Sequence, residues 1–218
     1  MTATASRMVP YITAREGEEA DTFLALRASF GADGRSRLSY WDETRDDRDV
    51  RGTLWARTSQ SIGRDGMPEG SPRWRLVHPA RQRHTMMNLL CQVCVGSTKT
   101  PDGYLFLESG TVPGPSATVR TAQPPVCLKH ARAAAKLCPN LVRHGHIALM
   151  VQSAPLYGVI GTPYQWGSDG VRALAGDDIP LPYGSPNLRW FLASQLVRTL
   201  RAFTVIDLDD LDDLAPAA

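Results

Sequence analysis

Two short motifs in the middle of the chain carry four side chains that can bind a metal ion. The first is Cys91-Gln-Val-Cys94, in which two thiols can chelate one ion from a tight turn. The second is Cys127-Leu-Lys-His130, whose end residues lie on one face if the segment is helical. Three thiolates and one imidazole form a closed tetrahedral set that is typical of structural zinc. The sequence therefore predicts one structural Zn²⁺ held by Cys91, Cys94, Cys127 and His130.

The fourth cysteine, Cys138, is expected to stay outside this site. It follows Cys127 by eleven positions, so in an unbroken helix it would lie about 16 Å further along the axis. We interpret it as a buried thiol without a metal. An alternative makes it a catalytic nucleophile, with His144 or His146 as its base.

Two further metal sites can be considered from the sequence. His144 and His146 lie two apart on an expected strand and would share a face, but no third ligand is near them in the chain. The acidic run at 42–49 could bind a divalent cation through carboxylates. Arg45 and Arg48 interrupt that run and would compete for the carboxylates, which favours a solvated loop.

The composition limits the classes of protein that the chain can belong to. With 218 residues, of which 43% are hydrophobic, it can form one domain or two small ones. The formal net charge of +2 gives no global field for a nucleic acid or a membrane. No apolar run reaches the about 20 residues of a membrane helix, and the first residues lack a signal-peptide core. We therefore expect a cytoplasmic protein, in which cysteines bind metal rather than form two disulfides. No oligomeric state is predicted.

The basic residues suggest a partner for the protein. All but three of the 24 are arginine, which indicates either a surface for phosphate or carboxylate groups or a bias of genomic composition. The basic residues nearest the motifs are predicted to contact nucleic acid or, alternatively, to form a solvated face. They are Arg81, Arg83, Lys129, Arg132 and Lys136.

The first two-thirds of the chain are predicted to contain helices on either side of a hairpin. A helix is expected over 18–30 in the N-terminal region 1–77, and another over 79–90, where Pro79 suits the first turn. The zinc unit, 78–140, should contain strands at 104–107 and 117–121 joined around 110–115. A helix should then run over 127–137, ending before Pro139.

The last third is predicted to be a hairpin followed by a long amphipathic helix. Within 141–204, strands are expected at 147–151 and 156–160, and Ser185-Pro186 should begin a helix that reaches Phe203. The remainder, 205–218, should be an acidic tail. The predicted fold class is α+β, with the zinc unit packed against the C-terminal hairpin and helix.

The order of knuckle, hairpin and helix over residues 88–140 resembles the treble-clef zinc fold, which includes the HNH nucleases. That resemblance implies a helix whose first turn supplies the last two ligands. The catalytic histidines of HNH nucleases have no counterpart here, because no histidine lies between Cys94 and His130 and the corresponding strand carries only Glu108. The likeness therefore implies an HNH-related scaffold without nuclease chemistry.

The chain also resembles small proteins of high-GC bacteria and their mobile elements to which no function is assigned. The shared motifs are Arg81-Gln-Arg83 followed by Cys91-Gln-Val-Cys94, the segment Pro124 to Ala131, and the segment Leu188 to Arg198. This likeness implies no activity.

Two functions follow as hypotheses. The first is a zinc-stabilised binding protein that contacts nucleic acid or a protein partner. The alternative is an enzyme with a small-molecule or nucleic-acid substrate, on a degenerate HNH-type scaffold with structural zinc. Its pocket would be lined by four aromatic residues, Tyr157, Tyr164, Trp166 and Tyr183.

Overall fold

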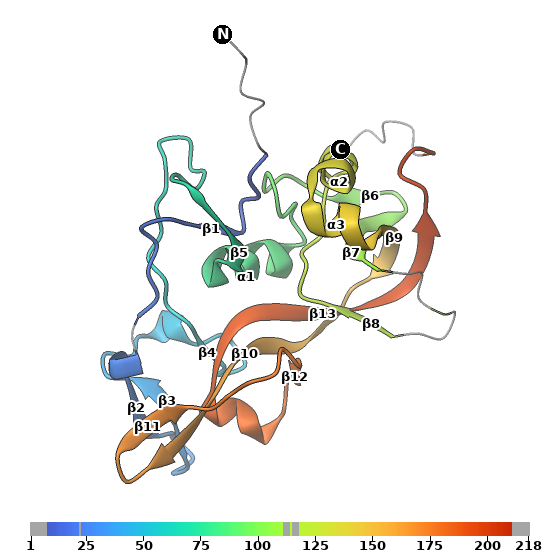
Figure 1. Ribbon diagram of the computed structural model, residues 1–218. Helices are drawn as coiled ribbons and strands as arrows, with labels where there is room; N and C mark the ends of the chain where they lie inside the picture. Colours follow the sequence, from blue (N-terminus) through green and yellow to red (C-terminus); the bar gives the residue numbers. More distant parts are fainter. Residues whose placement is uncertain (1–7, 22, 111–113, 115–117, 211–218) are drawn as a thin grey trace.

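The protein is mostly β-structure, organised around one curled sheet of nine strands (Figure 1). The computed structural model describes residues 8–21, 23–110, 114 and 118–210. Among these described residues, strands hold 42% and helices 18%. The order along the main path of the sheet is β11-β10-β13-β9-β7-β6, while β12 pairs with β10 and both β4 and β8 pair with β13.

Strand β13 (Phe191–Ile206) is the spine of this sheet. Its first half pairs antiparallel with β10 (Leu156–Gly167), and its second half pairs antiparallel with β9 (His146–Ser153). Its other edge takes β4 (Leu54–Trp55) in parallel and β8 (Val119–Thr121) antiparallel. Segments from four regions of the sequence therefore meet on one strand.

Shorter strands complete the sheet on either side. Beyond β9 come β7 (Gly103–Ser109) and β6 (Lys99–Thr100), whose tight turn needs Gly103. A Cβ there would lie 2.3 Å from the carbonyl oxygen of Val151. Beyond β10 come β11 (Gly170–Ala173) and β12 (Leu181–Pro182).

Two small antiparallel sheets are built from the N-terminal part of the chain. One pairs β1 (Thr13–Arg15) with β5 (Pro72–Val77), and the other pairs β2 (Leu26–Phe30) with β3 (Ser36–Tyr40). Short 3₁₀ turns lie at three places: Phe23–Ala25, Arg45–Asp47 and Pro186–Trp190.

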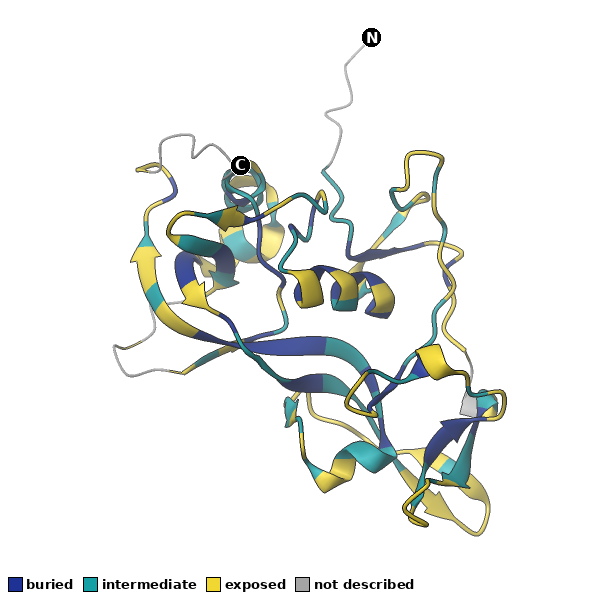
Figure 2. Ribbon diagram, turned by 180° about the vertical axis from the view of Figure 1, so that it is seen from behind, coloured by how far each residue is buried: buried dark blue, intermediate teal, exposed yellow. Residues whose placement is uncertain are grey.

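The described residues form three α-helices: α1 (Pro79–Asn88), α2 (Leu128–Leu137) and α3 (Pro139–His144). Helix α1 begins with Pro79, and the His78 side chain accepts a hydrogen bond from the backbone N–H of Arg81. Figure 2 shows α1 lying against the buried middle of the sheet, while α2 and α3 stand together at one end.

Helix α1 is attached to β13 by buried polar side chains. The Gln82 amide nitrogen donates to the carbonyl oxygens of Ala122 and Leu196, at 2.7 and 2.9 Å, and its amide oxygen accepts from the Leu196 N–H at 2.8 Å. From the strand, Arg198 donates to the carbonyl oxygens of Met86 and Met87. Gln82 thus occupies the edge of β13 between β4 and β8, where no strand pairs with Leu196 on that side in the described chain.

The N-terminal segment is anchored on the same helix by a buried ion pair. Glu18 and Arg81 have fully buried side chains, and Arg81 Nη2 lies 2.7 Å from Glu18 Oε2. Burial alone would raise the pKa of Glu18, but the hydrogen bonds from Arg81 and from the backbone N–H groups of Arg15 and Ser61 lower it to about 2. The carboxylate therefore stays ionised and holds the chain around Arg15 against α1.

The predicted α+β class, with a treble-clef unit packed against a long amphipathic helix, is wrong. The strand after the knuckle, β7, belongs to the nine-stranded sheet and pairs with β9. The segment expected to return onto it forms β8, which pairs with β13 instead. Most of the expected 110–115 connection lies outside the described residues.

The long helix predicted from Ser185 to Phe203 is also wrong. Ser185 does cap a helical turn, because its Oγ accepts from the Asn187 N–H, but the turn ends at Trp190 and β13 follows. The sheet is buried on both faces around Leu196–Leu200, so hydrophobic residues do not alternate there. Their spacing then matches a helical stripe by coincidence.

The predicted pairing of 147–151 with 156–160 is also wrong. Both segments are strands, β9 and β10, but they follow one another along the same edge of β13 and pair with it instead of with each other. The helix expected over 18–30 is replaced by a 3₁₀ turn and β2, whose Leu26 packs beside Leu38 of β3 in one core cluster.

The helices expected over 79–90 and 127–137 are confirmed as α1 and α2, to within two residues at their ends. Residues 211–218 of the expected acidic tail lie outside the described residues. The division into four regions stays a prediction.

We predict that Gln82→Met lowers the free energy of unfolding by about 2–4 kcal/mol. Methionine has nearly the same length but leaves the N–H and C=O of Leu196 buried without partners, at a cost of about 1–3 kcal/mol for each group. Urea unfolding followed by circular dichroism measures the change. Asn187→Ala, at an exposed side chain in the 3₁₀ turn before β13, is the control and should unfold like the parent. Equal midpoints for Gln82→Met and the parent would contradict the bridging role.

Candidate metal centre

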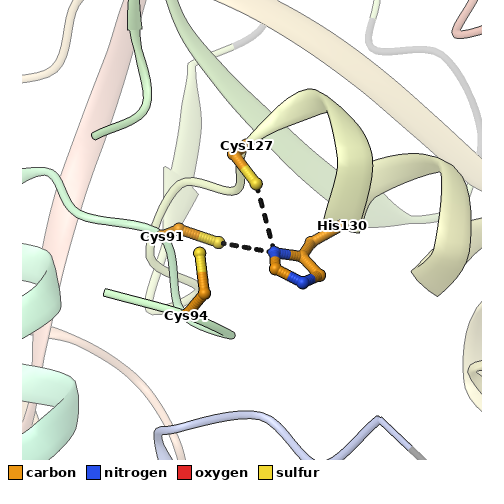
Figure 3. A group of neighbouring side chains, drawn as sticks. All are labelled: Cys91, Cys94, Cys127 and His130. Atoms are coloured by element: carbon orange, nitrogen blue, oxygen red, sulfur yellow. Dashed lines mark hydrogen bonds between the residues drawn. The ribbon is translucent and has the colours of Figure 1, made fainter. Parts of the chain in front are cut away.

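The four predicted ligands lie together in the structure (Figure 3). The Sγ atoms of Cys91, Cys94 and Cys127 and a ring nitrogen of His130 are all within 4.8 Å of one another. His130 Nδ1 lies 3.1 Å from Cys127 Sγ and 3.6 Å from Cys91 Sγ. In a tetrahedral zinc site with ordinary bond lengths, sulfur and nitrogen ligands are about 3.5 Å apart. The group is therefore near enough to bind one metal ion.

The first two ligands come from a tight knuckle that follows α1. Leu89 ends the helix in the left-handed region, with φ of 53°. The Cys91 N–H then donates to the Gly96 carbonyl oxygen at 2.9 Å, and the Val95 N–H donates to the Cys91 carbonyl oxygen at 2.9 Å. Val95 also has a positive φ, 62°, which is unfavourable for a β-branched residue. The knuckle thus holds a strained backbone that its surroundings must stabilise.

Gly96 leaves room for the second thiol. A Cβ built at Gly96 would lie 3.3 Å from Cys94 Sγ, which is closer than such contacts usually are. The absence of a side chain therefore lets Cys94 turn toward the other ligands.

The other two ligands come from the start of α2. Cys127 is the N-cap residue, and its carbonyl oxygen accepts from the N–H groups of His130 and Ala131 at 3.0 and 2.9 Å. His130 lies one turn along, so its ring points back toward Cys127 (Figure 3). The helix geometry thus supplies both ligands from one turn, as their spacing predicted.

The two halves of the site are tied together by hydrogen bonds through Gln92. Its backbone N–H donates to the Pro125 carbonyl oxygen at 3.0 Å, and its side-chain amide donates to the Pro124 carbonyl oxygen at 3.1 Å. On the other side, the N–H groups of Tyr11 and Ile12 donate to the carbonyl oxygens of Val93 and Gln92. Sequence reasoning did not find Gln92, because no motif marks a residue between two ligands as a brace.

The thiols influence one another's pKa values. A hydrogen bond with Cys91 lowers the pKa of Cys127 to about 7, while the same interaction, together with burial, raises that of Cys91 to about 12. Burial also raises the pKa of Cys94. The N–H of His130 further stabilises the Cys127 thiolate at the helix N-terminus. These hydrogen bonds therefore favour the thiolate form at Cys127 over Cys91.

The centre caps a hydrophobic cluster at the end of the sheet. Cys91 is fully buried, whereas Cys94 is exposed, and Cys127 and His130 are half-buried. The buried members of the cluster come from the knuckle, β7, α2, β9 and the segment after β13: Cys91, Val93, Leu105, Leu107, Val126, Ala131, Ala148 and Leu208. An ion at the site would thus crosslink the chain segments that enclose this core.

The structure does not bring together ligands for the other metal sites considered from the sequence. Among the residues that the structure describes, three or more metal-binding side chains come together in the Cys₃His group and nowhere else. Cys138 caps the end of α2 and is not part of the group. His144 and His146 do not belong to it either.

The acidic run at 42–49 is neutralised by arginines. Asp47 accepts from Arg57 at 2.6 and 2.7 Å, and Glu43 accepts from Arg48 at 2.9 Å. The hydrogen bonds from Arg57 lower the pKa of Asp47 to about 2. These carboxylates therefore stabilise the N-terminal sheet instead of a cation.

The predicted nucleic-acid residues are distributed over different environments. Arg81 is fully buried against Glu18, so its assignment to a nucleic-acid surface is wrong. Arg83 is half-buried, with its guanidinium over the Trp55 ring. On α2, Lys129 and Lys136 are exposed. Arg132, the third predicted residue of this helix, donates to the Leu208 carbonyl oxygen at 3.0 Å.

A surface cavity of about 580 Å³ lies far from the metal centre, beside β10 and the 3₁₀ turn before β13. It takes in two of the four aromatic residues predicted for an enzyme pocket, Tyr164 and Trp166. Its lining has no carboxylate, histidine or cysteine, and burial raises the pKa of Tyr164. The cavity thus offers no acid or base near neutral pH.

Comparison of the chain with known protein families, with curated proteins and with solved structures finds no match. The resemblances to HNH nucleases and to small bacterial proteins therefore rest on the motifs alone. Within the described residues, no helix is both long enough and apolar enough to cross a membrane.

We predict that Cys127→Ser abolishes metal binding by the purified protein, whereas Cys138→Ser leaves one metal ion per chain. The first change removes a ligand and the second does not touch the group. Metal content by mass spectrometry of the dialysed protein gives the readout. Retention of a full equivalent of metal by Cys127→Ser would refute the assignment of the ligands.

Proposed function

We propose that the protein is a zinc-stabilised binding protein, in which Cys91, Cys94, Cys127 and His130 hold one Zn²⁺. The observation that carries this proposal is the meeting of three thiols and one imidazole within 4.8 Å. Thiolates favour soft or borderline ions, and a tetrahedral set of sulfur and nitrogen ligands suits zinc.

The ligand set supports a structural role for the ion. Four protein ligands fill the tetrahedron and leave no position for a water molecule or a substrate, which a catalytic zinc requires. The hydrophobic cluster beneath the centre fits this role, because the ion would join the knuckle to α2 above it.

Binding is favoured over catalysis as the activity. The described cavity lacks an acid or base, and the ligand set is closed, so neither location supplies reacting groups. The partner we propose is nucleic acid, because arginine dominates the basic residues and some arginines are held at the surface.

Cobalt substitution tests the coordination. Protein refolded with Co²⁺ in place of the native ion should show the intense visible bands of a tetrahedral thiolate site. Because the set is closed, azide should leave the spectrum unchanged. Weak octahedral bands, or a spectrum that shifts with azide, would contradict a closed structural site.

Loss of stability on metal removal tests the structural role. Chelation should lower the melting temperature and expose the cluster beneath the knuckle, since metal affinity in such sites is part of the folding energy. Melting that is identical with and without chelator, in protein shown to contain the metal, would contradict it.

A further inference from the structure

The guanidiniums of three arginines lie over aromatic rings beside α1 and the middle of the sheet. The guanidinium of Arg120 is 3.9 Å from the ring centre of Tyr157. Those of Arg51 and Arg83 are 4.8 and 4.6 Å from the ring centres of Tyr183 and Trp55. Arg51 and Arg120 are exposed, and Arg83 is half-buried. We call these three residues the arginine face.

The rings that support the arginine face are neighbours in the fold. The Tyr183 N–H donates to the Tyr157 carbonyl oxygen at 2.9 Å, which places the two tyrosines opposite each other on adjacent chain segments. Tyr183 also packs in the same core cluster as Trp55. The loop before β4, helix α1, strand β8 and the segment after β12 therefore each contribute to one surface.

The nearby carboxylate of Asp49 accepts hydrogen bonds from two of the supporting aromatic side chains and forms no ion pair with the guanidiniums of the arginine face. Its Oδ2 accepts from the Tyr183 hydroxyl at 3.0 Å and from the Trp55 indole nitrogen at 3.2 Å. Its Oδ1 accepts from the backbone N–H groups of Arg51 and Thr53. Asp49 thus fixes the positions of the Tyr183 and Trp55 side chains, over which Arg51 and Arg83 lie.

The positive charge of the arginine face has no ion-pair partner within the described chain. Other arginines in the protein do have such partners: Arg37, Arg48, Arg57, Arg81 and Arg189. Members of the arginine face are instead oriented by π-faces, which leave the N–H edges of a guanidinium free to donate outward. Three guanidiniums that lie over aromatic rings and have no ion-pair partner among the described residues fit an anion of repeated charge.

We propose that the arginine face binds the phosphodiester backbone of nucleic acid. A guanidinium matches the two oxygens of a phosphate with paired hydrogen bonds, and successive phosphates supply the repeated charge. The supporting rings are covered by the arginines, so no free ring face is offered for stacking on a base. Binding should therefore be independent of sequence and strongly dependent on salt.

This proposal rests on the proposed binding function and gives its partner a location, but it does not depend on the identity of the metal. It also separates the arginine face from the lysines of α2, which lie on the zinc side of the molecule. The two surfaces can be tested against each other.

Fluorescence anisotropy with a short labelled DNA duplex of mixed sequence tests the arginine face over a series of salt concentrations. The triple variant Arg51→Gln, Arg83→Gln, Arg120→Gln should bind roughly 100-fold more weakly at low salt. Its slope of log affinity against log salt should become shallower by about 0.9 for each phosphate that the variant no longer neutralises. The double variant Lys129→Gln, Lys136→Gln and the single variant Arg189→Gln are controls that should keep the parent affinity and slope.

A second triple variant, Arg51→Lys, Arg83→Lys, Arg120→Lys, is the control for loss of DNA binding caused by misfolding. It keeps the charge, so it should keep most of the salt slope, and the melting temperature and zinc content of every variant are measured alongside. Full zinc content without DNA binding by the parent would overturn this proposal and the nucleic-acid partner proposed above but leave the zinc site standing, whereas DNA binding by a protein without zinc would overturn only the metal assignment.

Two other outcomes would also overturn the proposal. One is an unchanged salt slope in the glutamine triple variant. The other is competition by polyglutamate: if it displaces the labelled duplex as effectively as unlabelled DNA does, the partner of the arginine face would be an acidic protein.

Discussion

The fold around the knuckle depends on the convergence of three thiols and one imidazole at a single point. The Cys91 and Cys127 thiols interact with each other, with Cys94 and with His130, and the knuckle backbone is strained at Val95. An ion at that point would fasten the end of α1 to the start of α2 above their shared hydrophobic cluster. Coordination would thus add to the stability that this hydrophobic cluster gives to the end of the sheet.

Helix α1 carries this constraint into the rest of the molecule. Gln82 completes one edge of β13, Arg81 anchors the N-terminal segment through Glu18, and the end of the helix leads into the first ligand. Arg83, on the same helix, reaches the surface over Trp55. One ten-residue helix therefore contacts the sheet, the metal centre and the arginine face. A change in the position of α1 should therefore alter the structure of all three.

The metal ligands could be predicted from the sequence because their geometry is local. The spacing of Cys127 and His130 needs only one helical turn, and the exclusion of Cys138 needs only the rise of a helix. Strand pairing is not local, since β13 meets segments that are far away in the chain. Its burial on both faces also removes the alternation that reveals a strand. The burial of Arg81 could not be foreseen either, because its partner, Glu18, lies 63 residues away in the sequence.

X-ray absorption at the zinc edge of the purified protein is the decisive measurement for the metal centre. We expect a first shell of three sulfur atoms at about 2.3 Å and one nitrogen at about 2.0 Å, with no oxygen. A shell that contains a water oxygen, a different count of sulfur atoms, or no zinc in the protein would contradict a closed Cys₃His site.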